Sequence, residues 1–266
     1  MNRLFVIKIG GNVIDDENNL SKFLTKFAAI EGKQILIHGG GKIATKLGNK
    51  LGVESKYIDG RRITDTETID LVTMVYGGLV NKKIVAQLQA LHCNAIGLTG
   101  ADANIIPATK RPITDEGIDF GFVGDVLPDQ LKTNNLQLFL ENKLTPVFAP
   151  LTHDGKGQIL NTNADTIASV VAVALSSVYD VRLIYCFEKK GVLENMNDEN
   201  SVIPLLTTDS YEQLKASNKL FDGILPKIDN AFAAIDSGVK EVLIGHADDI
   251  VQNTTQNTTG TLIKER

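Results

Sequence analysis

Short apolar segments alternate with segments of helical periodicity along the whole chain, and this alternation restricts the fold more than any other feature. The strand-like segments are residues 4–9, 34–38, 95–98, 146–149, 181–186 and 241–244, and the helical patterns span residues 20–30, 43–51, 66–91, 129–142, 164–176 and 226–237. Such alternation is typical of a parallel α/β sheet. Because the strand segments are apolar throughout, helices should cover both faces. The sequence therefore predicts a three-layer α/β sandwich with a mostly parallel central sheet.

Two segments interrupt the alternation, residues 54–64 and 104–126. The second is rich in Gly, Pro and β-branched residues, which is typical of hairpins, so we expect the two segments to form a β-hairpin lid. Neither a low-complexity linker nor a repeat of solenoid period occurs. We interpret residues 1–266 as a single domain with lobes at about 1–160 and 161–266, and two separately folding domains are the alternative.

Composition and charge exclude several classes of protein. The 266 residues are 43% hydrophobic and carry 27 Lys and Arg against 32 Asp and Glu, a net charge of −5, so there is no overall positive field to bind nucleic acid. The longest apolar run, residues 167–175, is too short to cross a bilayer. The two Cys and four His show no zinc-ligand spacing, so no protein-bound metal site is expected. We interpret the chain as a soluble cytoplasmic protein.

Two glycine-rich loops follow predicted strands. The first strand ends in Lys8, Ile9, Gly10 and Gly11, and the second ends in an HGGGK segment at residues 38–42. The carboxyl ends of parallel strands form the ligand crevice of an open α/β sheet, and glycines let backbone N–H groups approach an anion. Neither loop matches GxGxxG or GxxxxGK[ST]. Tight turns between strand and helix are the structural alternative.

Two lysines lie in positions that local structure does not favour. Lys8 is within an apolar strand, where a buried cation is costly unless it is paired or reaches a crevice. Lys227 follows Pro226 in the first turn of a predicted helix, where a cation opposes the helix dipole. An anionic ligand between them would explain both positions. For Lys8, a side chain that extends to solvent from an edge strand is the alternative.

Further polar residues lie near predicted turns. Residues 161–165 (NTNAD) form a turn rich in capping residues before a helix, with Asp165 in its first turn. Arg61 and Arg62 follow an Asp-Gly turn in the first hairpin segment. They are either a carboxylate clamp, for which the fork of arginine is suited, or solvated charges.

Together these segments resemble the amino acid kinase family over nearly the whole chain. The matching segments are VIKIGG at 6–11, HGGG at 38–41, GRRIT at 60–64, GLTG at 97–100, GFVG at 121–124, LNTNAD at 160–165 and DGILPK at 222–227. The resemblance implies phosphoryl transfer from ATP to a carboxylate. The order of GRRIT and NTNAD resembles the members that phosphorylate N-acetyl-L-glutamate in arginine biosynthesis.

The resemblance also implies roles for individual residues. The first lobe would bind the amino-acid substrate and the second ATP, with Mg²⁺ bridging the β- and γ-phosphates. The catalytic residues would be Lys8 and Lys227, which stabilise the transferring phosphoryl group, and Asp165, which orients both. The acceptor would be bound by Gly40, Gly41, Arg62 and Asn161. ATP would be bound by Gly10, Gly11, Glu188, Lys189, Lys190, Gly191, Val192, Leu193, Lys219, Leu220 and Phe221.

One segment departs from the family pattern. Relatives usually carry Thr/Ser-Asp-Val-x-Gly-Val where this chain has FEKKGV at residues 187–192. Glu188 in place of that Asp keeps the charge but lengthens the arm. This difference concerns the details of nucleotide contact.

Three alternatives for the function and one expectation for assembly follow. The alternatives to a kinase for N-acetyl-L-glutamate are of three kinds. They are a catalytically silent sensor, a sibling kinase that acts on aspartate, glutamate, carbamate or a nucleoside monophosphate, and a kinase for N-succinyl-L-glutamate. The last needs a cation for the additional carboxylate, and Arg61, Lys56 and Lys42 are candidates. Since no helix precedes the first strand, the resemblance implies a homodimer without arginine regulation. We expect it to be joined through residues 66–91.

Overall fold

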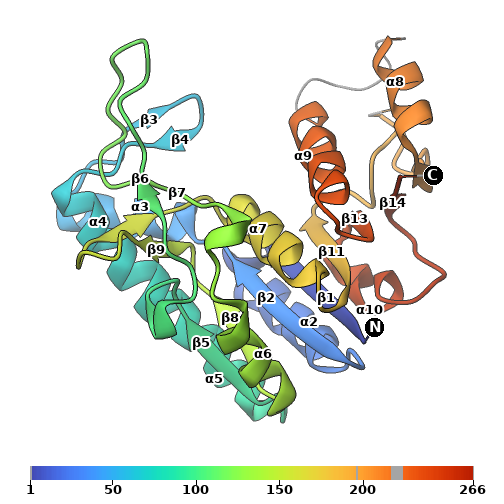
Figure 1. Cartoon of the computed structure of the whole chain (residues 1–266), viewed down its shortest axis with the longest axis horizontal. Coiled ribbons are helices and arrows are strands. Elements are labelled where there is room, and N and C mark those ends of the chain that lie inside the picture. The colour runs from blue at the N-terminus through green and yellow to red at the C-terminus, as the bar shows by residue number, and fades with distance from the viewer. Residues whose placement is uncertain (1, 196, 217–223, 266) are drawn as a thin grey trace.

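The computed structural model describes residues 2–195, 197–216 and 224–265 of the chain, and an eight-stranded sheet lies at its centre (Figure 1). In spatial order its strands are β12 (Leu205–Leu206), β14 (Thr261–Ile263), β13 (Glu241–His246), β11 (Asp180–Phe187), β1 (Arg3–Ile9), β2 (Lys33–His38), β8 (Thr145–Phe148) and β5 (Ala95–Leu98). Only the β13–β14 pair is antiparallel among these neighbours. The predicted mostly parallel sheet is confirmed.

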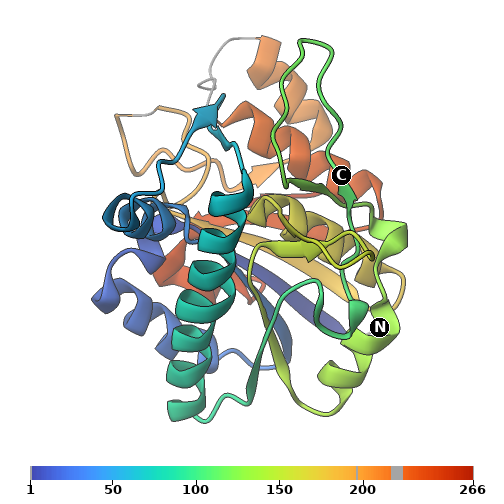
Figure 2. The same ribbon diagram turned by 90° about the vertical axis from the view of Figure 1, so that its left-hand side faces the viewer.

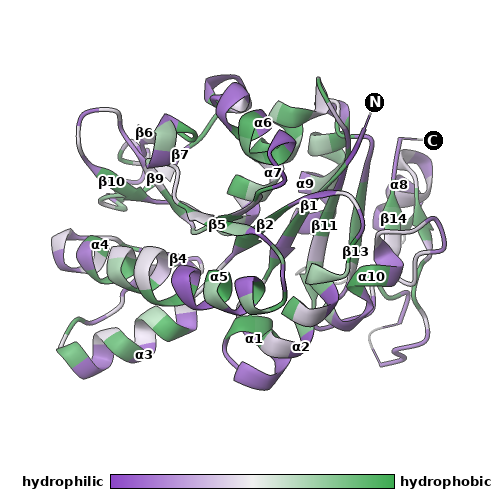
Figure 3. Cartoon of the chain, turned by 90° about the horizontal axis from the view of Figure 1, so that it is seen from below, coloured by the Kyte–Doolittle hydropathy of each residue, from purple (hydrophilic) through white to green (hydrophobic). Residues whose placement is uncertain are grey.

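Helices cover both faces of this sheet (Figures 1 and 2). One face is packed by α6 (Thr133–Glu141), α7 (Ala164–Ser176) and α9 (Leu225–Asp236), and the other by α2 (Glu17–Ala28), α5 (Asn81–Ala90) and α10 (Ile250–Asn253). Side chains alternate along β1, so that Leu4 and Val6 join the first layer while Phe5 and Ile7 join the second. The outer helices show bands of hydrophilic and hydrophobic residues, as expected for helices that bury one side (Figure 3).

The predicted helix over residues 66–91 is continuous but not regular. It consists of α4 (Thr66–Val72), a π-helical segment η1 (Thr73–Val80) and α5. The sequence did not predict the π segment, which contains Gly77 and Gly78. Because π segments widen the turn, they change which residues face the sheet on either side. Here Tyr76 and Asn81 are both buried against the glycine-rich loop that follows β2.

Both segments that interrupt the alternation form hairpins, as predicted. β3 (Tyr57–Ile58) pairs with β4 (Arg61–Arg62) across a turn in which Asp59 and Gly60 have φ of 49° and 74°, the geometry that Asp-Gly favours. β6 (Thr109–Lys110) pairs with β7 (Gly124–Asp125). A third hairpin, β9 (Leu151–His153) with β10 (Ile159–Asn161), was not predicted. Thr64 bridges to Gly121 and thereby joins the first two hairpin segments.

The remaining differences from the sequence prediction lie in short elements and helix ends. A 3₁₀ turn at Pro128–Gln130 precedes α6, which begins at Thr133 and not at residue 129, because Leu131 adopts an extended conformation. Further unpredicted elements are α1 (Gly11–Ile14), α8 (Thr208–Ala216), α10, β12, β14 and the 3₁₀ turns η2 (Asp102–Asn104) and η4 (Ala247–Asp249). The helix predicted at residues 43–51 is α3 (Gly41–Leu51). In the described part of the chain, no helix has the length and apolar content needed to cross a bilayer.

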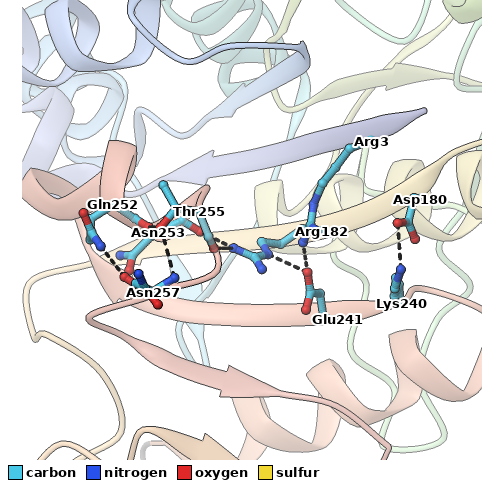
Figure 4. Close-up of polar contacts among 9 residues, drawn as sticks. All are labelled: Arg3, Asp180, Arg182, Lys240, Glu241, Gln252, Asn253, Thr255 and Asn257. Carbon is cyan, nitrogen blue, oxygen red and sulfur yellow. Dashed lines mark hydrogen bonds and ion pairs between the residues drawn. The ribbon is translucent and has the colours of Figure 1, made fainter. Parts of the chain in front are cut away.

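A buried polar cluster fastens the C-terminal segment to the sheet (Figure 4). The Arg182 guanidinium donates to Glu241 Oε1 at 2.7 Å and to the carbonyl oxygens of Asn253 and Thr255 at 2.7 and 2.6 Å. Arg3 forms an ion pair with the same Glu241. Burial lowers the pKa of Arg182 to about 10, so the guanidinium remains charged at neutral pH. The turn after α10 is thus attached to β11. Strands from both predicted lobes, before and after residue 160, belong to the same central sheet. The single domain over residues 1–266 stays a prediction.

Candidate active site

Strand alternation determines the direction of Lys8. Leu4, Val6 and Lys8 share one face of β1, the face that α7 and α9 cover. Lys8 is 8% exposed, and its Nζ lies 2.8 Å from Asp165 Oδ1. This ion pair offsets the cost of burying a lysine in an apolar strand.

Asp165 reaches this position because α7 begins just before it. The Asn163 side chain caps the helix by accepting hydrogen bonds from the backbone N–H groups of Asp165 and Thr166 at 2.7 and 3.2 Å. The predicted cap is confirmed. It places the carboxylate in the first turn, pointing toward the C-terminal end of β1.

Lys227 approaches from the other helix of the same layer. It lies in the first turn of α9, after Pro226, as predicted. Its Nζ is 3.8 Å from the centroid of the Phe187 ring, and the Lys8 Nζ is 5.8 Å from the same centroid. Burial lowers the pKa of Lys227 and the positive charge of Lys8 lowers it further, while the negative charge of Asp165 raises it. The fold therefore brings both lysines and Asp165 together.

A cavity of about 230 Å³ adjoins these three charged groups. Gly10 and Gly11 line it, as does Glu188. A Cβ on Gly10 would lie 3.8 Å from the Lys8 Nζ, so this part of the backbone is close to the ammonium. We refer to this space as the lysine cavity.

A second cavity, of about 410 Å³, lies beside the glycine-rich loop at residues 39–41. Arg61, Arg62, Arg111 and Asn161 contribute polar groups to its wall, and Asp165 lines it as well. We refer to it as the arginine cavity. Because Asp165 lines both cavities, they meet at the Lys8–Asp165 ion pair.

Arg62 connects the first hairpin with the glycine-rich loop. It is 8% exposed, and its Nη2 donates to the Gly41 carbonyl and to Thr45 Oγ1, both at 2.9 Å. Its Nη1 donates to Ser55 Oγ. These bonds use three of the five N–H donors of a guanidinium. Arg62 is therefore a buried part of the wall of the arginine cavity. The alternative that it is a solvated surface charge is wrong.

His38 shapes the glycine-rich loop from beneath. The ring is fully buried, its Nδ1 is 2.7 Å from the Gly39 carbonyl oxygen, and its Nε2 is 3.1 Å from Asn81 Nδ2. The neutral tautomer that donates from Nδ1 satisfies both contacts. Burial lowers the pKa of His38 to about 4, so the ring is neutral at neutral pH.

Gly40 is the residue of this loop that requires glycine. Its φ is 150°, and a Cβ there would lie 3.0 Å from Tyr76 Cδ1.

Comparison with known proteins identifies the family. Residues 3–246 match the profile of the amino acid kinase family. The chain belongs to this family. It is 52% identical to an acetylglutamate kinase of Cytophaga hutchinsonii, with 97% of each chain covered, and 52% identical to one of Phocaeicola vulgatus, with 99% of each covered. Its fold is similar to that of N-acetylglutamate synthase from Neisseria gonorrhoeae, with a TM-score of 0.82 and 21% identity. The match covers the whole of this chain and 60% of that one.

Sequence reasoning missed three residues of this amino acid kinase site. Arg111 donates from Nη2 to Asp125 Oδ1 at 2.6 Å and lies over the Phe120 ring at 5.6 Å, so its guanidinium is fixed in the arginine cavity. Arg111 lies in an irregular segment, where no periodicity in the sequence indicates which way a side chain points. Tyr76 depends on the unpredicted π segment. Phe187 was noticed only as a departure from the family pattern.

Several residues predicted to bind the nucleotide do not line the lysine cavity. Val192 and Leu193 are buried in the core, Lys190 is exposed, and Lys189 pairs with Glu199 at 2.8 Å. Gly191 packs closely on Thr261, where a Cβ would lie 2.6 Å from Oγ1. Lys219, Leu220 and Phe221 lie outside the described residues. The nucleotide roles of this group stay predictions.

Other polar residues near the site differ in exposure. Asn161 lines the arginine cavity and donates to Thr64 Oγ1 at 3.0 Å. The Lys42 side chain is 72% exposed and lies 3.5 Å from Asp15. No group of three or more His, Cys, Asp or Glu side chains suited to a metal ion occurs within residues 2–195, 197–216 and 224–265.

Proposed function

We propose that this amino acid kinase transfers the γ-phosphoryl group of ATP to the side-chain carboxylate of N-acetyl-L-glutamate, an early step of arginine biosynthesis. The relatives at 52% identity over nearly the full chain are acetylglutamate kinases, which supports this assignment. The single observation that carries the chemistry is the Lys8–Asp165 ion pair where the two cavities meet. A reacting carboxylate in one cavity and a triphosphate in the other would meet at this pair.

The acceptor needs no general base, because a carboxylate is already ionised near neutral pH. We assign it to the arginine cavity, with its side-chain carboxylate toward the backbone N–H groups of Gly40 and Gly41. Arg62 and Asn161, which line the same cavity, would hold the α-carboxylate. The neutral His38 beneath the loop adds no charge there.

The lysine cavity would hold the phosphates of ATP. A carboxylate oxygen attacks the γ-phosphorus in line, the bond from that phosphorus to the bridging oxygen breaks, and ADP leaves with the electron pair. Lys8 and Lys227 would stabilise the negative charge on the equatorial oxygens, and Asp165 would fix the Lys8 ammonium. The principal task is to bring two anions together, and paired cations accomplish it.

Mg²⁺ would accompany ATP. Among the described residues, Asp165 and Glu188 are the carboxylates that line the lysine cavity. Mg²⁺ bound to phosphates keeps several waters and needs few protein ligands, which fits this sparse donor set. When bound, the ion neutralises charge on the β- and γ-phosphates.

N-Succinyl-L-glutamate is a second candidate acceptor. Two arginines besides Arg62, namely Arg61 and Arg111, line the arginine cavity, whereas Lys42 and Lys56 do not line it. An additional carboxylate on the acyl group would find a cation there, which offsets part of its desolvation cost.

ADP release with a panel of acceptors tests these assignments. N-acetyl-L-glutamate should exceed L-glutamate, L-aspartate and carbamate in kcat/KM. A tenfold preference for the succinyl compound, about 1.4 kcal/mol, would select the second candidate. The absence of ADP release with every acceptor would favour a silent binding module.

We also propose a homodimer joined through the long helix at residues 66–91. Met74 and Leu79 on η1 are 58% and 51% exposed, which is unusual for large apolar side chains so close together. Light scattering after size exclusion should give twice the chain mass, and Met74→Glu with Leu79→Glu should give a monomer. A monomeric wild type would contradict this proposal.

A further inference from the structure

Phe187 ends β11 with its ring beside both lysines. Side-chain alternation places Leu183, Tyr185 and Phe187 on the face of β11 that α7 and α9 cover. The Tyr185 ring stacks on Phe187 at 6.2 Å with 22° between the planes, which supports the ring. Phe187 is only partly buried and lines the lysine cavity.

The ring contact is closest for Lys227. An ammonium within about 6 Å of a ring centroid is attracted by the negative face of the ring. Lys227 Nζ lies at 3.8 Å and Lys8 Nζ at 5.8 Å, so one ring contacts both cations. Asp165 Oδ1 is engaged by Lys8 at 2.8 Å. Among the carboxylates in the described ranges, none forms an ion pair with Lys227.

We propose that Phe187 is a positioning residue, which holds the Lys227 ammonium at the lysine cavity through its ring face. This inference rests on the proposed function, since it concerns the approach of Lys227 to the phosphoryl group. A lysine has a flexible four-carbon stem, and in the first turn of α9 the helix dipole disfavours its charge. A carboxylate here would also hold Lys227 but would repel the triphosphate. The ring attracts the ammonium without adding negative charge.

A role in stacking adenine is less consistent with this geometry. At 3.8 Å the Lys227 ammonium already covers one face of the ring, and Tyr185 stacks on the ring as well. A base would have to displace one of these groups.

Fluorinated phenylalanines at position 187 test the proposal, because successive fluorines weaken the negative ring face with little change of shape. Under saturating ATP and N-acetyl-L-glutamate, kcat should fall stepwise from Phe to 4-fluoro- to 3,4,5-trifluorophenylalanine, by about tenfold in total. KM for the acceptor should stay constant. Phe187→Leu should lower kcat at least as much, and Phe187→Trp should restore it.

The same fluorinated series at Phe23 is the matched control. This ring is 1% exposed within the α2 layer, so its fluorination should leave kcat unchanged. A flat kcat across the series at Phe187, with thermal midpoints intact, would overturn the proposal and leave the ring a packing role.

A readout independent of activity separates this inference from the proposed function. Lysines are converted to ¹³C-dimethyl-lysine, which keeps the charge, and the Lys227 signal is assigned with Lys227→Arg. Its methyl resonance should be shifted upfield by the ring current in the wild type and return to the bulk lysine position in Phe187→Leu. An unshifted Lys227 signal in the wild type would refute the contact, whatever the acceptor proves to be.

Discussion

Replacement of Lys8 should abolish most of the catalytic rate while the fold persists. In Lys8→Met the alkyl chain still fills its place in β1, but the charge that lies 2.8 Å from Asp165 is lost. A group that stabilises charge mainly in the transition state contributes about 2 to 4 kcal/mol, so kcat should fall about 30- to 1000-fold. The Asp165 side chain is 36% exposed, but the Oδ1 atom that pairs with Lys8 is buried, so water solvates the unpaired carboxylate only in part. The free energy of unfolding should therefore decrease by only about 1 to 3 kcal/mol, between the values for surface and buried pairs.

The assay couples ADP release to a spectroscopic signal at saturating ATP and N-acetyl-L-glutamate, with urea unfolding measured on the same preparations. Lys42→Met is the matched control, because Lys42 is 72% exposed and should affect neither kcat nor unfolding. KM for the acceptor should change little in Lys8→Met. A variant with near wild-type kcat would refute the assignment of Lys8 to the phosphoryl group.

Three further predictions concern the glycine-rich loop and its neighbours. Arg62→Ala should raise KM for the acceptor with little change in KM for ATP, since a carboxylate contact is made equally in ground and transition states; equal increases in both would show a purely structural role. Gly40→Ala should lower the free energy of unfolding by about 1 to 3 kcal/mol, because its φ is 150° and a Cβ would lie 3.0 Å from Tyr76. Gly41→Ala, with open space around its Cβ, should not lower this free energy in urea titrations. The pKa of His38 is lowered to about 4, so its contribution to stability is complete above pH 6.5 and is lost as pH falls toward 4. Urea midpoints of the wild type should therefore fall more steeply over this range than those of His38→Gln, and parallel profiles would contradict this reasoning.

The sequence predicted those parts of the fold whose signals are local and continuous. The helix α7 has the predicted ends, because Asn163 caps it and an apolar run follows. For this helix one short segment of sequence contains the whole signal. The Lys8–Asp165 pair joins two distant segments, and it was expected only because the family resemblance implied it.

The remaining features depend on pairings between distant segments. β12 is only Leu205–Leu206 and is defined by its pairing with β14. The contacts from His38 to Asn81, and from Asn81 to the Val147 carbonyl at 2.9 Å, connect three separate elements. Arg111 enters the arginine cavity because Asp125 on the partner strand holds it. None of these contacts has a periodicity or spacing that a single sequence reveals.

The π segment makes the length of the long helix functionally important. A π turn is what an α-helix becomes when one additional residue is accommodated between fixed ends. Regular α-helix through η1 with every residue retained would rotate the following residues by about 100°. Asn81 would then turn away from His38, and the glycine-rich loop would lose the support of its buried imidazole. A helix that lacks one residue of η1 would reach the same ends in regular α-helical form. In homologous sequences that keep His and Asn at positions 38 and 81, a regular helix here should therefore be one residue shorter.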